Sequence, residues 1–178
     1  WQSLVDAAQL QAGQTVLIHA AAGGVGSLAV QLAKARGARV IATASALNSG
    51  IVTELGADQF IDYTKTHFED VATDVDVVFD TIGGDTQKRS WQVLKPGGIL
   101  VSVVSPPPEA VAATHGVRGA FVFIRPSGEQ LTQIADLIDG GRMRPVIHTV
   151  LPLAEVRQAH VISQTGHARG KIVLQVAE

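Results

Sequence analysis

The chain has 178 residues, of which 46% are hydrophobic and 17% charged, and its formal net charge is -2. This composition predicts one globular domain with a full core, and it excludes an intrinsically disordered segment. The charge, without any run of Lys or Arg, argues against nucleic acid as the main partner. The apolar stretches are strand-length and interrupted, so no transmembrane span is expected.

Cysteine is absent, which excludes disulfides and thiolate metal sites within this chain and makes a cytoplasmic location the default expectation. The first residues are typical of the middle of a helix, because Trp1, Leu4, Val5 and Ala8 share one face and no cap precedes them. We therefore expect the chain to be part of a longer protein.

Strand-like and helical patterns alternate along the chain. Apolar runs predict strands at 15–20, 38–44, 58–63, 74–81, 97–104, 121–124, 146–150 and 171–176. Apolar residues at helical spacing predict helices over 25–37, 48–55, 85–98, 127–141 and 153–164. Three prolines in a row and two later glycines predict a loop over 105–119.

This alternation predicts an α/β fold, a Rossmann-type doubly wound parallel sheet of about six strands with helices on both faces. We expect residues 1–178 to form this single dinucleotide-binding domain. In such sheets ligands bind at the carboxyl ends of the strands, where the strand order reverses.

The segment HAAAGGVG at residues 19–26 lies between the first predicted strand and the first predicted helix. In that context Gly23 lets the backbone approach a pyrophosphate, and Gly26 lets the helix pack closely on the strand. The helix N-terminus offers N–H groups and the positive end of its dipole. Ala21 occupies the place of the first glycine of the G-x-G-x-x-G pattern. The alternative is a strand-to-helix turn that needs small residues for packing alone.

Two other nucleotide sites fit less well. A P-loop needs Lys and then Ser or Thr directly after its glycines, whereas Gly26 precedes Ser27 and Leu28. A methyltransferase would suit LKPGGIL at 94–100, but the carboxylate that such domains usually place near the end of strand two is absent. An S-adenosylmethionine-dependent methyltransferase and a dinucleotide-sensing module without chemistry stay open as alternatives.

The second predicted strand ends with Thr43, Ala44 and Ser45, where an NAD site places Asp or Glu on the ribose 2′-hydroxyl. A carboxylate would repel a 2′-phosphate, whereas Ser45 and nearby N–H groups could bind one. The sequence therefore favours NADPH over NADH, unless Ser45 only begins a turn.

Five segments in series resemble the medium-chain dehydrogenase/reductase superfamily, and more closely its zinc-independent quinone oxidoreductase branch. They are VLIHAAAGGVG, LGADQFIDY, VVFDTIGG, LKPGGILVSVV and GHARGKIVL, and the resemblance covers essentially the whole chain. It implies the cofactor domain of a two-domain enzyme, with residues 151–178 returning toward an N-terminal catalytic domain. It further implies NADPH-dependent hydride transfer to a quinone or an activated C=C bond of an enone or enoyl substrate. The substrate pocket would lie between the domains, so no catalytic residue is assigned in this chain.

The resemblance also implies where the phosphates of the cofactor would bind. The pyrophosphate would lie against Ala22, Gly23, Gly24, Val25 and Gly26. The 2′-phosphate and the adenosine would lie against Ser45 and Tyr63. Relatives often have Lys three residues past Ser45, where this chain has Asn48. Arg169 or Lys171 could supply the missing charge if the last strand returns to that pocket.

The remaining implied contacts lie toward the nicotinamide. Thr81 would lie beside the cofactor, Val103 and Val104 would back the nicotinamide, and Phe123 would belong to the sixth strand. The apolar edge at 121–124 would pair with its copy in a homodimer, as it often does in relatives.

Other features receive structural interpretations or stay open. The loop at 105–119 either covers the nicotinamide end or is a plain crossover. The six histidines show no metal-ligand spacing, so His19 and His148 are expected to be structural and no metal is expected in this chain. Asp80 is expected to bond N–H groups of the turn that follows it. We expect the 178-residue chain alone to bind the cofactor weakly and to turn over little or nothing.

Overall fold

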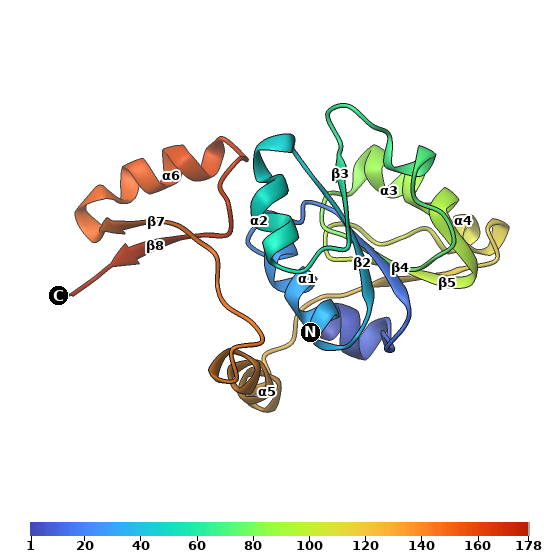
Figure 1. Ribbon diagram of the computed structural model, residues 1–178, viewed down its shortest axis with the longest axis horizontal. Coiled ribbons are helices and arrows are strands. Elements are labelled where there is room, and N and C mark those ends of the chain that lie inside the picture. Colours follow the sequence, from blue (N-terminus) through green and yellow to red (C-terminus); the bar gives the residue numbers. More distant parts are fainter. Residues whose placement is uncertain (178) are drawn as a thin grey trace.

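The computed structural model describes residues 1–177, which form a six-stranded parallel sheet with helices on both faces and a smaller C-terminal arm (Figure 1). The strand order is β3-β2-β1-β4-β5-β6. The strands are β1 (Thr15–Ile18), β2 (Arg39–Ala44), β3 (Gln59–Asp62), β4 (Val75–Asp80), β5 (Leu94–Ser102) and β6 (Arg118–Phe121). This confirms the Rossmann-type fold, and the order reverses between β1 and β4.

The central strands are apolar on both sides because helices cover both faces. In β1, Val16 and Ile18 join one hydrophobic cluster, while Leu17 joins the cluster on the opposite face. The first cluster packs against η1 (Gln2–Ala7), α1 (Gly26–Ala35), α2 (Ser49–Glu54) and α5 (Gly128–Asp139). The second packs against η3 (Phe68–Asp70), η4 (Trp91–Val93) and α4 (Glu109–Thr114), with α3 (Gly84–Ser90) leading into η4.

The helix predicted over 85–98 is shorter than its pattern indicated. After α3 and η4, Leu94 already pairs with Val75 of β4, and the register then shifts before Val77 pairs with Ile99. Gly97 has a left-handed φ of 79°. The KPGG segment is therefore an irregular start of β5, because the strand pairing of Leu94 ends the helix before the proline and glycines do.

The predicted loop at 105–119 was wrong in two places. It contains α4, which begins directly after Pro108, and β6 begins at Arg118. The segment EAVAAT in α4 is rich in strong helix formers, and a proline just before a helix costs it no hydrogen bond. Gly116, with φ 64°, stops the helix.

The sixth strand was predicted at 121–124 but lies at Arg118–Phe121. Its ladder with β5 ends at the pair Ser102–Phe121, and one further hydrogen bond joins the Val122 N–H to the Ser102 carbonyl. Beyond that point β5 has ended, so Phe123 and Ile124 have no neighbouring strand with which to pair.

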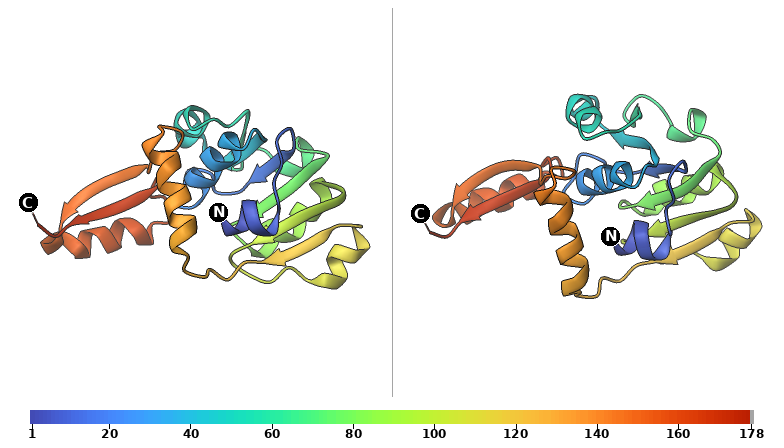
Figure 2. Two further views of the ribbon diagram at one scale, coloured as in Figure 1. Left: turned by 90° about the horizontal axis from the view of Figure 1, so that it is seen from below. Right: turned by 60° about the horizontal axis from the view of Figure 1, so that its bottom comes forward.

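The last quarter of the chain forms an arm that projects from the main body beyond α5 (Figures 1 and 2). The arm consists of β7 (Ile147–Pro152), η5 (Leu153–Glu155), α6 (Val156–Gln164) and β8 (Lys171–Gln175), with β7 and β8 pairing in parallel. A single bridge, Gly23–Gly170, joins the base of β8 to the glycine-rich segment of the main body. The strands predicted at 146–150 and 171–176 therefore lie outside the main sheet.

Within residues 1–177, no helix has the length and apolar character needed to cross a membrane.

Candidate cofactor site

The candidate site lies at the carboxyl ends of the central strands. The glycine loop, residues 19–26, leaves β1 and enters α1 at its N-cap residue Val25. α1 has no side-chain cap and no acidic residue in its first turn. The Ser27 N–H donates to the Gly23 carbonyl at 3.0 Å, and no acidic side chain of the first turn competes with an incoming phosphate for the remaining amides.

Gly26 has a steric requirement for glycine. A Cβ atom there would collide with the Ala20 carbonyl oxygen and would lie 2.8 Å from the Ala21 Cα. Ala20 itself has a left-handed φ of 49°, and its carbonyl accepts the Gly23 N–H at 2.9 Å. This tight turn lets α1 approach β1 closely, as the spacing of the glycines predicted.

Ala21 fits where the common pattern has a glycine. It is fully buried, and its N–H donates to the Thr43 carbonyl of β2 at 2.9 Å. Its methyl group joins the hydrophobic cluster beneath the loop. Ala21 is thus a core residue of the loop. Gly23, Gly24, Val25 and Gly26 lie at the N-terminus of α1.

At the end of β2, Ser45 bears no charge and its hydroxyl oxygen accepts from the Asn48 amide nitrogen at 3.0 Å. Tyr63, one residue past β3, is 55% exposed beside this corner and its N–H donates to the Ala44 carbonyl. The structure thus brings Ser45, Asn48 and Tyr63 together.

One carboxylate near this corner was missed from the sequence. Asp62 ends β3 and pairs in register with Ala44. A hydrogen bond from the Thr64 hydroxyl, with further help from backbone amides and Lys65, lowers the pKa of Asp62. The Oδ2 atom of Asp62 and the Oδ1 atom of Asn48 are both buried without a hydrogen-bond partner in the described chain. The register of β2 and β3 could have revealed Asp62 only if the pairing had been known.

The C-terminal arm returns to this corner. The guanidinium of Arg169 donates to the Leu47 carbonyl at 3.3 Å, and the Arg169 N–H donates to His148 Nδ1 at 3.2 Å. Lys171 lies elsewhere, with its side chain beside Gly24 of the glycine loop. Of the two cations considered from the sequence, Arg169 is therefore the one next to the end of β2.

The turn after β4 is built on a buried carboxylate. Asp80 accepts from the N–H groups of Ile82 and Gly83 at 3.0 and 2.8 Å. It also accepts from the Gln87 amide and the Ser102 hydroxyl at 2.9 and 2.8 Å. These four hydrogen bonds to Asp80 hold the turn in place, and the two from backbone N–H groups are the ones predicted.

Thr81, which follows Asp80, donates its hydroxyl to the His19 carbonyl at 2.9 Å and is partly buried. It thereby ties the turn after β4 to the glycine loop after β1. These are the two strands between which the sheet order reverses. A contact of Thr81 with the cofactor stays a prediction.

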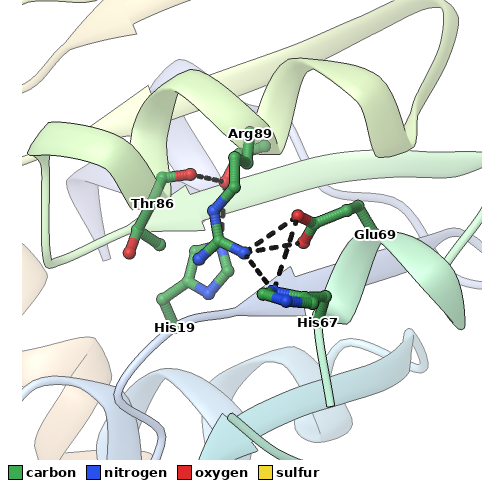
Figure 3. Close-up of polar contacts among 6 residues, drawn as sticks. His19, His67, Glu69, Thr86 and Arg89 are labelled. Atoms are coloured by element: carbon green, nitrogen blue, oxygen red, sulfur yellow. Dashed lines mark hydrogen bonds and ion pairs between the residues drawn. The ribbon is translucent and has the colours of Figure 1, made fainter.

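His19 is a buried structural residue beneath the loop, only 1% exposed. Its Nε2 lies 2.9 Å from the Ser90 hydroxyl, which itself donates to the Thr86 carbonyl, so Nε2 carries the proton (Figure 3). Its Nδ1 then accepts from the Thr43 hydroxyl at 3.1 Å. Burial lowers the pKa of His19 to about 4, and the imidazole is neutral at pH 7.

A polar cluster that sequence reasoning missed lies next to His19 on the α3 side (Figure 3). Arg89 donates to both carboxylate oxygens of Glu69 at 2.9 and 3.1 Å and lies 3.1 Å from His67 Nδ1. Its guanidinium also stacks 4.9 Å above the ring of Phe68. Burial opposes ionisation of Glu69, but the hydrogen bonds outweigh it and lower its pKa. The cluster fixes η3 against α3.

The residues predicted near the nicotinamide divide into two groups. Val103 lines an apolar pocket of about 380 Å³ together with Gly24, Val25 and Val122. Val104 is half-exposed and lies over Gly83. Phe123 is 83% exposed and faces a separate shallow hollow. Val122 and Ile124, on either side of Phe123, line the apolar pocket instead, and Val122 also lines the second hollow.

Comparison with known proteins places the chain in a family. A sequence model described as "Zinc-binding dehydrogenase" matches residues 55–174. This chain belongs to the zinc-binding dehydrogenase family. The resemblance to the medium-chain dehydrogenase/reductase superfamily and its quinone oxidoreductases is thereby confirmed.

Two curated relatives and one solved structure are similar over nearly the whole chain. "NAD(P)H oxidoreductase RTN4IP1, mitochondrial" of Mus musculus is 36% identical over 92% of this chain and 48% of its own length. "NADPH-dependent alkenal/one oxidoreductase, chloroplastic" of Arabidopsis thaliana is 37% identical over 93% of this chain and 42% of its own. The quinone oxidoreductase from Coxiella burnetii is 38% identical, with a TM-score of 0.90, over 98% of this chain and 56% of that one. The chain thus spans about half the length of these relatives.

The family name refers to zinc. Within residues 1–177, however, no group of three or more His, Asp or Glu side chains could hold a metal ion. The donors present in these residues therefore do not fit a zinc ion.

Proposed function

We propose that this chain is the NADPH-binding domain of an oxidoreductase that transfers hydride to a quinone or to an activated C=C bond of an enone or enoyl substrate. The observation that carries the proposal is the uncapped N-terminus of α1, reached through a turn in which only glycine fits at Gly26. Relatives named as quinone and NADPH-dependent alkenal/one oxidoreductases support the same chemistry.

The residues present fit a dinucleotide. The loop from Ala22 to Gly26 would bind the pyrophosphate, with the amides of α1 donating to its oxygens. Thr81, Val103 and Val104 would lie along the nicotinamide half. When bound, the cofactor supplies hydride from C4 of the nicotinamide. The protein's part in this domain is to bind and orient the ring and to exclude water from it.

The preference for NADPH depends on Arg169. The two unpartnered atoms near Ser45, on Asn48 and Asp62, are acceptors and would suit ribose hydroxyls better than a phosphate. Arg169 reaches the Leu47 carbonyl beside them and supplies the charge that a 2′-phosphate needs. We therefore assign the 2′-phosphate to Ser45 and Arg169, with Tyr63 beside the adenosine.

The test is calorimetric titration of the full-length protein with NADPH, NADH and S-adenosylmethionine at fixed salt. Tight binding of NADPH is the expected result. Preference for NADH would mean that Asn48, in place of lysine, decides specificity. Binding of S-adenosylmethionine alone would replace the oxidoreductase proposal with a methyltransferase. NADPH binding without turnover of any quinone or enone would favour a sensing module.

We also propose that the arm, from β7 to β8, packs on a catalytic domain that contributes the rest of the substrate pocket. This is the expectation for residues 151–178, of which residue 178 lies outside the described residues. On this basis the 178-residue chain alone binds the cofactor weakly and turns over little or nothing. Several apolar side chains of the arm are strongly exposed, among them Val150, Leu153 and Val161. Robust quinone reduction by the 178-residue chain would contradict this assignment.

A homodimer through the free edge of β6 is a further part of the proposal. β6 is the last strand of the sheet, and Phe121 at its end is 40% exposed. An uncovered strand edge that ends on an exposed aromatic side chain favours pairing with a second copy. Sedimentation of the gene product should give the mass of a dimer, and Phe121→Lys should shift it to a monomer. The cytoplasmic location that the sequence analysis expects also stays a prediction.

A further inference from the structure

Helix α5 has little apolar packing of its own. It stands between the main body and the C-terminal arm (Figure 2). Among the residues of α5 only Leu137 is buried, whereas Leu131 is 65% exposed and Ile138 is 38% exposed. The position of α5 must therefore depend on contacts that the neighbouring segments make.

The segment before α5 is held by a side chain in place of a strand. Within residues 1–177, no backbone–backbone hydrogen bond involves residues 123–126. Instead the Oε1 atom of Gln2 accepts from the Arg125 N–H at 3.0 Å, and its Nε2 atom donates to the Arg125 carbonyl at 2.6 Å. A primary amide offers the same kinds of donor and acceptor as a peptide group. Gln2, at the start of η1, thus satisfies both backbone groups of Arg125, and we call this contact the Gln2 clip.

The segment after α5 is held in the same way by Gln31 of α1. The Oε1 atom of Gln31 accepts from the Arg144 N–H at 2.8 Å, and its Nε2 atom donates to the Arg144 carbonyl at 2.9 Å. The Arg144 side chain also pairs with Glu54. This contact is the Gln31 clip, so two glutamines from two different helices bind the backbone on either side of α5.

The two clips differ in their exposure to water. Gln31 is only 6% exposed. Gln2 is partly exposed, and its amide also donates to Gln130 at 2.7 Å, whose own amide donates to Asp6 at 2.7 Å. Water replaces the partners of an exposed hydrogen bond more readily than those of a buried one. The C-terminal end of α5 is therefore the fixed end, and the N-terminal end is the one that can be released.

Both α5 and the segment before it form walls of the apolar pocket of about 380 Å³. The pocket is lined by Leu131 and Ile134 of α5, by Val122 and Ile124 before it, and by Leu28 and Leu32 of α1. Its lining includes Val103, which the proposed function puts beside the nicotinamide. A shift of α5 therefore changes the walls of the space next to the ring.

We propose that Gln2 and Gln31 are positioning residues, whose clips hold α5 and the segment before it as walls of the pocket, and that α5 opens from its Gln2 end around the Gln31 clip. The effect on catalysis rests on the proposed function, whereas the clips themselves do not. Neither glutamine touches the cofactor in this assignment. Hydride transfer depends on the alignment of the ring with its acceptor, so loosening the Gln2 clip lowers turnover and not cofactor affinity.

The structural test measures hydrogen exchange in Gln2→Met, Gln31→Met and Gln133→Met variants of the full-length protein. Methionine keeps the length of the side chain and removes the amide. Gln2→Met should speed exchange over residues 122–131 by about tenfold and leave residues 141–147 unchanged. Gln31→Met should speed exchange over residues 141–147. Gln133 lies on α5 outside the clips and the pocket lining, so Gln133→Met is the matched control and should change neither segment.

The catalytic test measures steady-state kinetics with NADPH and whichever of para-benzoquinone and methyl vinyl ketone the wild type reduces. Gln2→Met should lower kcat by about tenfold, because a small misplacement of a pocket wall disturbs the alignment of the reactants. The dissociation constant for NADPH should stay within about twofold of the wild type, since other residues bind the phosphates. A merely structural role would lower the unfolding temperature without separating kcat from cofactor binding. Gln2 is partly exposed, so this variant carries the test even if Gln31→Met does not fold.

Three results would overturn the positioning role. They are unchanged exchange over residues 122–131 in Gln2→Met, faster exchange with an unchanged kcat, and an equal effect of Gln133→Met. Failure of the wild-type protein to bind either NADPH or NADH would instead overturn the proposed function, and the exchange rates would then still decide whether the two clips hold α5.

Discussion

At the scale of single residues, the site is defined by positions that tolerate only one side chain. Gly26 admits no Cβ because the Ala20 carbonyl occupies that space, and Gly170 admits none because of the Val146 carbonyl. His19 must be a neutral ring that accepts on one nitrogen and donates on the other. Each of these residues shapes the loop without any need to touch the cofactor.

Gly26→Ala should destabilise the fold and abolish cofactor binding. The methyl group would push α1 away from β1, at a cost of about 1–3 kcal/mol in the free energy of unfolding. Gly50→Ala is the matched control, because a Cβ there meets nothing within 4 Å and Gly50 lies inside α2. Gly50→Ala should raise the free energy of unfolding by about 0.5–1 kcal/mol, because alanine favours a helix more than glycine does. Urea denaturation measures both, and equal effects would refute the steric argument.

His19 should make stability depend on pH between about 4 and 6.5. Its folded pKa, about 4, is below the unfolded value of 6.5, so the unfolded chain binds the proton more readily in this window. Stability is therefore full above pH 6.5 and falls as the pH drops toward 4, by about 2 kcal/mol at pH 5.

His19→Gln should lower stability at pH 7 by about 1–3 kcal/mol, because it disturbs the bonds to Thr43 and Ser90. It should also remove most of the difference between pH 7 and pH 5. Urea denaturation of both proteins at the two pH values measures this. An unchanged difference would assign the pH dependence to other groups.

Asn48→Lys should strengthen NADPH binding. The substitution adds a positive charge three residues past Ser45, beside Arg169 and the end of β2. A charge-assisted contact with the 2′-phosphate should lower the NADPH dissociation constant by about tenfold and leave that of NADH unchanged. Fluorescence titration with both nucleotides provides the measurement. Equal gains for NADH would indicate general electrostatic attraction instead.

At the scale of elements, sequence patterns found the central sheet and misplaced its periphery. β1 is a continuous apolar run, and β4 and the second half of β5 are largely apolar, because these stretches are buried on both faces of the sheet. Such runs are visible in sequence. β6 is an edge strand of only four residues, and its limits depend on where β5 ends. α4 was hidden by the prolines that precede it.

The candidate site, like the sheet, could be predicted only in part from the sequence. The glycine loop was predictable because its glycines are local and their spacing has a physical reason. The contact of Arg169 with Leu47 could only be named as a condition, because it joins residues 122 positions apart and depends on where the last strand returns. Asp62 was missed because its proximity to Ser45 depends on the β2–β3 register.

At the scale of the whole molecule, stability is unevenly distributed. The main sheet has six strands between two helical layers, whereas the arm has two strands, one short 3-10 helix and one α-helix. Two paired strands are marginal on their own. The base of the arm contacts the main body at Gly170, which bridges to Gly23, and at Arg169, which donates to the Leu47 carbonyl.

The arm should therefore open more readily than the main sheet in the 178-residue chain. Hydrogen exchange should show faster exchange for the amides of β7 and β8 than for those of β1 and β4, because local opening exposes few buried contacts. NADPH should slow exchange at the base of β8, since Arg169 would then be held by the 2′-phosphate. In the protein as its gene encodes it, the whole arm should be protected if a catalytic domain covers its exposed apolar side chains. Arm protection that is equal to that of β1 in the 178-residue chain would show that the arm is stable by itself and that its apolar surface needs no further cover.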